Sequence, residues 1–97
     1  MNLRFTASAR NQFLAAVSYI RGDNPEAAWR FRRRAEKILR RLGEFPESGR
    51  VIPEFPDLPY CEVVIAPYRF FYRLKGDTVW LVAVRQGAQL PNSPEIQ

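Results

Sequence analysis

The chain has 97 residues, which is enough for one small domain with a single hydrophobic core. It is 46% hydrophobic and carries a formal net charge of +5, so it is not a disordered chain. It has no histidine and one cysteine, Cys61, which excludes a Ser-His-Asp or Cys-His mechanism, a zinc site and an intrachain disulfide.

Most of the positive charge comes from arginine, which supplies 13 of the 15 basic residues. Arginine binds phosphates and carboxylates through two hydrogen bonds at once, so the composition favours an anionic partner, either nucleic acid or an acidic protein. A merely solvated basic surface is the alternative. The sequence has no apolar run long enough to cross a membrane and no signal-peptide pattern after Met1, and we therefore expect a cytoplasmic protein with no membrane partner.

The first expected elements are a short strand and a helix. Residues 2–6 alternate polar and apolar side chains, which predicts a strand. Thr6 or Ser8 can cap a helix that runs to about Arg21 and ends at Gly22. The apolar residues of this helix recur at helical spacing and are Ala9, Phe13, Ala16, Val17 and Ile20.

A second helix is predicted from Pro25 to about Leu42, with Asn24 as its N-cap and Gly43 at its end. The short turn between the two helices predicts an antiparallel hairpin. The apolar seam of the second helix consists of Ala28, Phe31, Ala35, Ile38 and Leu42. Its basic face includes Arg30, Arg33, Arg34, Lys37 and Arg41.

The second half of the chain predicts an irregular segment followed by three strands. Residues 44–60 hold four of the eight prolines, and a connection of this length in a small domain is either functional or mobile. Strands are expected over residues 61–66, 68–74 and 78–86. Gly76 and Asp77 suit a type II′ hairpin turn between the last two strands. Residues 88–97 are expected to form a loose C-terminal tail.

These elements predict a single α+β domain over residues 1–97, with the order β-α-α-β-β-β. A helix hairpin would pack on one face of a small, mostly antiparallel sheet and leave the other face open. With Arg73 opposite Trp80, the covered face carries Phe70, Tyr72, Leu74, Val79, Leu81 and Ala83. The open face carries Arg69, Phe71, Arg73, Trp80, Val82 and Val84.

An exposed face with arginines beside large aromatic side chains marks a partner site. Alternatively, the helices or the long irregular segment cover this face and the arginines extend to its edge. A slip of one residue at the turn would exchange the two sides of one strand.

The order of elements and several motifs resemble the RelE/ParE superfamily of bacterial type II toxins. The motifs are "YIRGDNPEAAWRF", "FPESGRVIPEF", "PYRFFYRLKGDTVWLVAV" and "GAQLP", and together they span nearly the whole chain. The resemblance implies a small toxin encoded beside an antitoxin. Such an antitoxin wraps an acidic, partly disordered segment around the toxin, and the pair represses its own operon.

The superfamily divides by activity, so the resemblance implies two alternatives. ParE-like members poison DNA gyrase, whereas RelE-like members cut messenger RNA on the ribosome, using arginines to hold the phosphate and lysines and a tyrosine to transfer protons. Only Arg69, in "YR-x-x-Y", matches the nucleases. The strand "CEVVIA" has Glu62 as its only charge, and Gln86 stands where many relatives have histidine.

We therefore expect a ParE-like gyrase inhibitor rather than an enzyme, with Arg69 as the catalytic candidate only if the chain is an endoribonuclease. A non-toxic, decayed binding module is a further alternative. No metal or cofactor is expected.

Four residues of the expected open face are the candidate binding site for antitoxin or target: Arg69, Phe71, Arg73 and Trp80. By family position, Arg50 and Arg85 are candidates for a second basic site, with a loop anchor and a strand-end salt bridge as the alternatives. The basic face of the second helix either meets the acidic antitoxin or is only solvated. It has no helix-turn-helix signature, so operator DNA would be bound only through the antitoxin.

Overall fold

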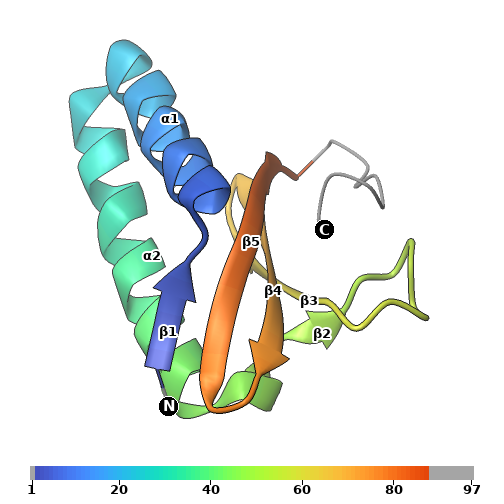
Figure 1. Ribbon diagram of the computed structural model, residues 1–97. Coiled ribbons are helices and arrows are strands. Elements are labelled where there is room, and N and C mark those ends of the chain that lie inside the picture. The colour runs from blue at the N-terminus through green and yellow to red at the C-terminus, as the bar shows by residue number, and fades with distance from the viewer. Residues whose placement is uncertain (1, 88–97) are drawn as a thin grey trace.

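The computed structural model describes residues 2–87 and has two helices on one face of a five-stranded sheet (Figure 1). The elements are β1 (Asn2–Phe5), α1 (Ala7–Asp23), α2 (Pro25–Glu44), the 3-10 helix η1 (Pro46–Ser48), β2 (Arg50–Val51), β3 (Cys61–Ile65), β4 (Tyr68–Lys75) and β5 (Thr78–Gln86). The predicted α+β architecture is confirmed, and η1 and β2 are short additions within the segment expected to be irregular. The predicted tail, residues 88–97, lies outside the described residues. No helix within residues 2–87 is long and apolar enough to cross a membrane.

Two side-chain caps set the starts of the helices. The Thr6 hydroxyl accepts the backbone N–H of Ala9 at 3.1 Å, and the Asn24 carboxamide oxygen accepts two backbone N–H groups at the start of α2. The predicted stops at Gly22 and Gly43 are wrong, because α1 runs to Asp23 and α2 runs to Glu44. Asn24 is the single residue between the two helices. Its backbone is extended rather than helical, and its side chain caps α2.

The core between the helices and the sheet is aromatic at its centre. Phe31 of α2 and Phe70 of β4 are fully buried, and Phe13 of α1 packs edge-on against Phe70 with ring centroids 5.8 Å apart. Leu39 is buried in α2, whereas the predicted Ile38 is only half-buried. Leu74, which was also expected here, is 48% exposed because it lies near the hairpin turn at the end of the sheet.

The sheet has the order β1-β5-β4-β3-β2, and β1 runs parallel to β5 while the other pairs are antiparallel. The predicted β4–β5 register holds from the turn as far as Tyr72. A β-bulge at Val82 then shifts it, so that Phe71 lies opposite Ala83. Ala83 therefore packs on the face away from the helices and Val84 packs beneath them, which reverses the predicted sides of both residues.

The second face of the sheet is covered, so the prediction of an open face is wrong. Residues 52–60, here called the strap, link β2 to β3 on the side away from the helices (Figure 1). Ile52 and Tyr60 of the strap are buried in one small cluster with Phe71 and Ala83. The strap presents apolar side chains between its prolines, and these close the face that two helices alone cannot reach.

Candidate functional site

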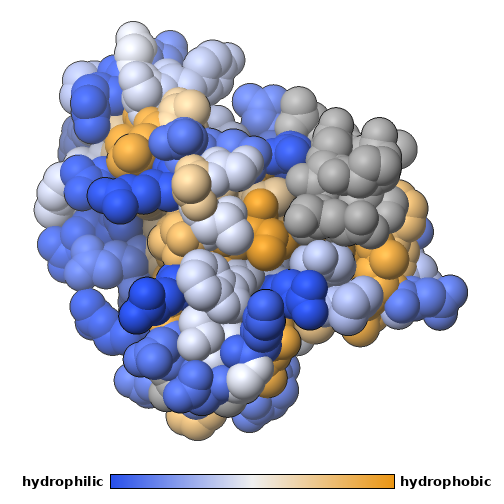
Figure 2. All heavy atoms as spheres, viewed as in Figure 1, coloured by the Kyte–Doolittle hydropathy of each residue, from blue (hydrophilic) through white to orange (hydrophobic). Residues whose placement is uncertain are grey.

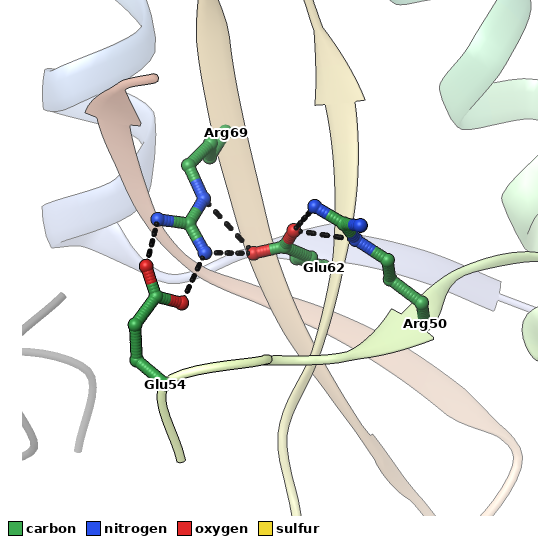
Figure 3. Close-up of polar contacts among 4 residues, drawn as sticks. All are labelled: Arg50, Glu54, Glu62 and Arg69. Carbon is green, nitrogen blue, oxygen red and sulfur yellow. Dashed lines mark hydrogen bonds and ion pairs between the residues drawn. The ribbon is translucent and has the colours of Figure 1, made fainter. Parts of the chain in front are cut away.

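Four charged residues form a row of alternating sign on the strap side of the sheet (Figure 3). Arg50 comes from β2, Glu62 from β3, Arg69 from β4 and Glu54 from the strap. Glu62 lies opposite Arg50 in the β2–β3 pair, which brings the first two together. The row therefore ties three neighbouring strands and the strap into one unit.

Arg69 lies at the centre of the row and donates to both carboxylates. Its Nε donates to Glu62 Oε1 at 2.9 Å, and its Nη1 and Nη2 donate to the two oxygens of Glu54 at 3.0 and 2.8 Å. The second carboxylate oxygen of Glu62 accepts from Arg50 Nε at 2.8 Å. Glu62 is fully buried and Arg69 is 6% exposed, so each buried charge is balanced within the chain.

The hydrogen bonds between Arg69 and Glu54 stabilise the charged forms of both side chains. The hydrogen bonds from Arg69 hold the pKa of Glu54 below its ordinary value. The hydrogen bonds to Glu54, followed by those to Glu62, raise the pKa of Arg69 against the opposing effect of burial. Glu54 is therefore a carboxylate at neutral pH, and it occupies the bidentate fork of the Arg69 guanidinium.

The four residues predicted to form an open binding face have different environments. Phe71 is fully buried, and Arg69 lies over its ring at 5.2 Å. Arg73 and Trp80 are half-buried, and Arg73 lies over the ring of Tyr60 at 5.6 Å. Only Arg73 and Trp80 of the predicted set therefore reach solvent.

Of Arg50 and Arg85, the candidates for a second basic site, Arg50 shares a carboxylate with Arg69. Arg50 meets it through Glu62, which matches the alternative of a loop anchor. Arg85 lies opposite Arg69 in the β4–β5 pair and donates to the carbonyl of Val84 at 3.1 Å.

Sequence reasoning missed Glu54 and Glu62 as partners of these arginines. A carboxylate inside the apolar strand "CEVVIA" was a usable signal, because a buried charge needs a partner. Glu54 had no such signal in its proline-rich surroundings.

The predicted basic face of α2 is present and exposed. Arg30 pairs with Glu26 at 3.3 Å, Arg34 donates to the carbonyl of Ala66 at 2.6 Å, and Arg33 stacks over Trp29. Within residues 2–87, no group of three histidine, cysteine or acidic residues is placed to hold a metal ion.

The fold and the comparisons identify the class of protein. Two helices lie on one face of a mixed five-stranded sheet. A solved structure described as the chromosomal ParDE TA system from P. aeruginosa has the same fold, with a TM-score of 0.72 over 89% of this chain and 95% of that chain at 18% sequence identity.

A family model described as the ParE toxin of the type II toxin–antitoxin system, parDE, matches residues 3–91. The chain therefore belongs to the ParE toxin family. Comparison with curated proteins gives no match.

Proposed function

We propose that this toxin arrests growth by inhibiting DNA gyrase through protein–protein contact, and that a cognate acidic antitoxin neutralises it. Membership of the ParE family supports the target class. The observation that carries the choice against RNA cleavage is the state of Arg69, whose guanidinium is held between Glu54 and Glu62. Arg69 therefore holds the strap in position rather than binding a phosphate.

RNA cleavage would require Arg69 to exchange its carboxylates for a phosphate. Glu54 would have to leave, and because this carboxylate is partly exposed, breaking its ion pair with Arg69 costs about 1 kcal/mol. Glu62 would remain within hydrogen-bonding distance of the guanidinium and would repel the incoming anion. The strand that carries Glu62 has no lysine to replace it, so the site lacks both a free anion binder and a proton donor.

The charge distribution of the toxin supports an acidic antitoxin as its partner. The net charge is +5, and the basic residues of α2 lie on an exposed surface. Long-range attraction to an acidic chain would speed its association. Arg73 and Trp80, which lie opposite each other in the β4–β5 pair and are each half-buried, offer a second, smaller contact area.

The proposal is tested with purified toxin and purified gyrase in a supercoiling assay. We expect supercoiling to fall with toxin concentration and cleaved DNA to accumulate, and we expect the product of the adjacent gene to restore activity. The same toxin added to a translation extract should leave messenger RNA intact.

Two results would contradict the proposal. Full supercoiling at high toxin excess, together with codon-biased cleavage in the extract, would assign the ribosome as target. Growth without arrest on induction of the toxin alone would point to a non-toxic binding module.

A further inference from the structure

Three side chains from neighbouring strands line up across the sheet on its strap side. Trp80 of β5 lies opposite Arg4 of β1 in one strand pair and opposite Arg73 of β4 in the other. Opposed residues share a face of the sheet. Val79 and Leu81, which precede and follow Trp80, pack beneath the helices, so the three side chains project from the other face. Arg4, Trp80 and Arg73 are here called the Trp80 platform.

The platform reaches solvent. Arg4 is exposed, and Arg73 and Trp80 are half-buried. The apolar cluster under the strap includes Phe71 and Ala83, which lie further along β4 and β5, and no residue of the platform. In the view of Figure 2, hydrophilic side chains lie to either side of less polar ones where β1 and β5 reach the surface. An approaching partner therefore meets an aromatic side chain with a cation on each side.

The charges of the platform are not neutralised within the part of the chain that the structure describes. Among residues 2–87, neither Arg4 nor Arg73 makes an ion pair, and β1, β4 and β5 contain no acidic residue. The Nε of Arg73 is buried and has no hydrogen-bond partner among these residues. Because a buried donor without an acceptor costs free energy, Arg73 has lost part of its hydration before any partner arrives.

Arg73 is also held in a fixed position. Its Cζ lies 5.6 Å from the centre of the Tyr60 ring, and Tyr60 is buried. A cation that rests on a fixed ring keeps its orientation, so a carboxylate that binds it loses less conformational entropy. Arginine and tryptophan at a partly desolvated surface are the residues that most often dominate the energy of protein–protein binding. These features make Arg73 a prepared binding site for a carboxylate.

We propose that the Trp80 platform is the surface through which the toxin contacts its target, and that it binds an acidic segment of the target protein. Carboxylates of this segment bind Arg4 and Arg73, and an apolar side chain packs on the indole of Trp80 between them. The two arginines start about 10 Å apart, two strand spacings, which leaves room for that apolar side chain. The inference rests on the proposed function, which names gyrase as the target and leaves open the surface that meets it.

The position of the platform favours the target protein over the antitoxin and over nucleic acid. The basic residues of α2, which support an acidic antitoxin, lie on the helix side of the sheet (Figure 1). An antitoxin held there leaves the platform free. Nucleic-acid binding usually neutralises several phosphates, whereas the platform has two cations and the basic residues of α2 cannot add to them from the other side.

Binding of purified gyrase to immobilised toxin tests the inference, and inhibition of supercoiling is the second measurement. Arg73→Gln removes the charge and the guanidinium fork, and we expect it to weaken gyrase binding about tenfold. The toxin concentration that gives half inhibition should rise in proportion. Arg73→Lys restores the charge without the fork and should recover part of the affinity. Exposed Arg21→Gln, in the last turn of α1, is the matched control and should leave the affinity unchanged.

A second variant does not depend on any buried contact. Arg4→Gln changes an exposed side chain of the edge strand, and we expect it to weaken gyrase binding about threefold, as for an exposed ion pair. Circular dichroism checks that each variant is folded. If the folded Arg73→Gln and Arg4→Gln variants bind and inhibit gyrase as the wild type does, the inference is overturned while the proposed function stands. A wild type that neither binds nor inhibits gyrase would overturn both.

Two further measurements separate the other possible partners. Arg73→Gln should bind the product of the adjacent gene as tightly as the wild type does. Equal losses of affinity for this product and for gyrase would overturn the assignment to the target. Binding of the toxin to a short DNA duplex alone should not change with the substitution. A loss there that equals the loss with gyrase would assign the platform to nucleic acid instead.

Discussion

The two faces of the sheet are closed in different ways. Two capped helices cover one face with a continuous apolar core centred on Phe31 and Phe70. The strap covers the other face with a small cluster around Ile52 and Phe71 and with a row of four charges. Apolar packing therefore provides the stability of the domain, whereas charge pairing holds a segment without regular structure in place. Single changes on the two faces should have different signatures.

The largest effect is expected on the helix face. Phe31→Ala removes a fully buried ring that contacts Phe13, Tyr68 and Phe70. We expect the free energy of unfolding to fall by about 3–5 kcal/mol, because the substitution leaves a cavity at the centre of the core. Urea unfolding followed by circular dichroism measures this. If the unfolding free energy falls no more than it does for a substitution at an exposed position, the core must close around the space left by the ring.

Removing the central carboxylate should be the most damaging change on the strap face. Glu62→Gln leaves Arg69 buried with less compensating charge, and we expect a loss of about 3 kcal/mol in unfolding free energy. Exposed Glu47→Gln is the matched control and should change little. If both variants unfold alike, the row of charges does not hold the strap.

Gly49 lies where the two faces meet. A Cβ atom built there would lie 2.3 Å from the hydroxyl of Tyr72 and 2.8 Å from the carbonyl of Glu62. The Tyr72 hydroxyl donates to the carbonyl of Pro46 at 2.7 Å, and burial raises its pKa to about 12. Gly49→Ala should therefore cost about 2 kcal/mol by forcing this ring and the backbone apart. Gly22→Ala, with open space around it, is the control and should not destabilise the protein.

The smallest and most local effect is expected at the strap contact itself. Glu54→Gln removes the charge that pairs with Arg69, and since this carboxylate is partly exposed we expect a loss of about 1 kcal/mol. Hydrogen exchange should rise in the strap and stay unchanged in the helices. Equal exchange in both regions would contradict the separation of the two faces.

The same pair predicts a dependence on pH. The pKa of Glu54 is lowered from its ordinary 4.5 by Arg69, so the stabilisation is complete above that value. It is lost as the pH falls through the lowered folded-state pKa. The difference in unfolding free energy between the wild type and Glu54→Gln should therefore be constant near neutrality and shrink below pH 4.5. A constant difference down to acid pH would rule out the ion pair.

Local chemistry made the helix face predictable from the sequence. Thr6, Asn24 and Pro25 mark helix starts, and the apolar spacing of α2 identifies the side that faces the sheet. The strap face was not predictable in the same way. The bulge at Val82 has no signature in the sequence of β5, and it exchanges the sides of the two residues that follow.

Coverage of the second face depends on contacts between distant segments. Ile52 lies among prolines and looks like a loop residue, yet it is fully buried against β4 and β5. Glu54 gains its role only because folding brings it to Arg69, 15 positions away. Sequence patterns report local preference and periodicity, and neither records such a pairing.

The most direct test of the account is whether Arg69 is available to a phosphate. The Nε–H signal of Arg69 is followed by nitrogen-15 NMR while a short single-stranded RNA is added to the toxin. Because Glu62 accepts this proton in a buried site, the account predicts a signal protected from exchange and unchanged by RNA. A signal that shifts with RNA while the Glu54 contact is lost would show that Arg69 binds phosphate, and would contradict the account.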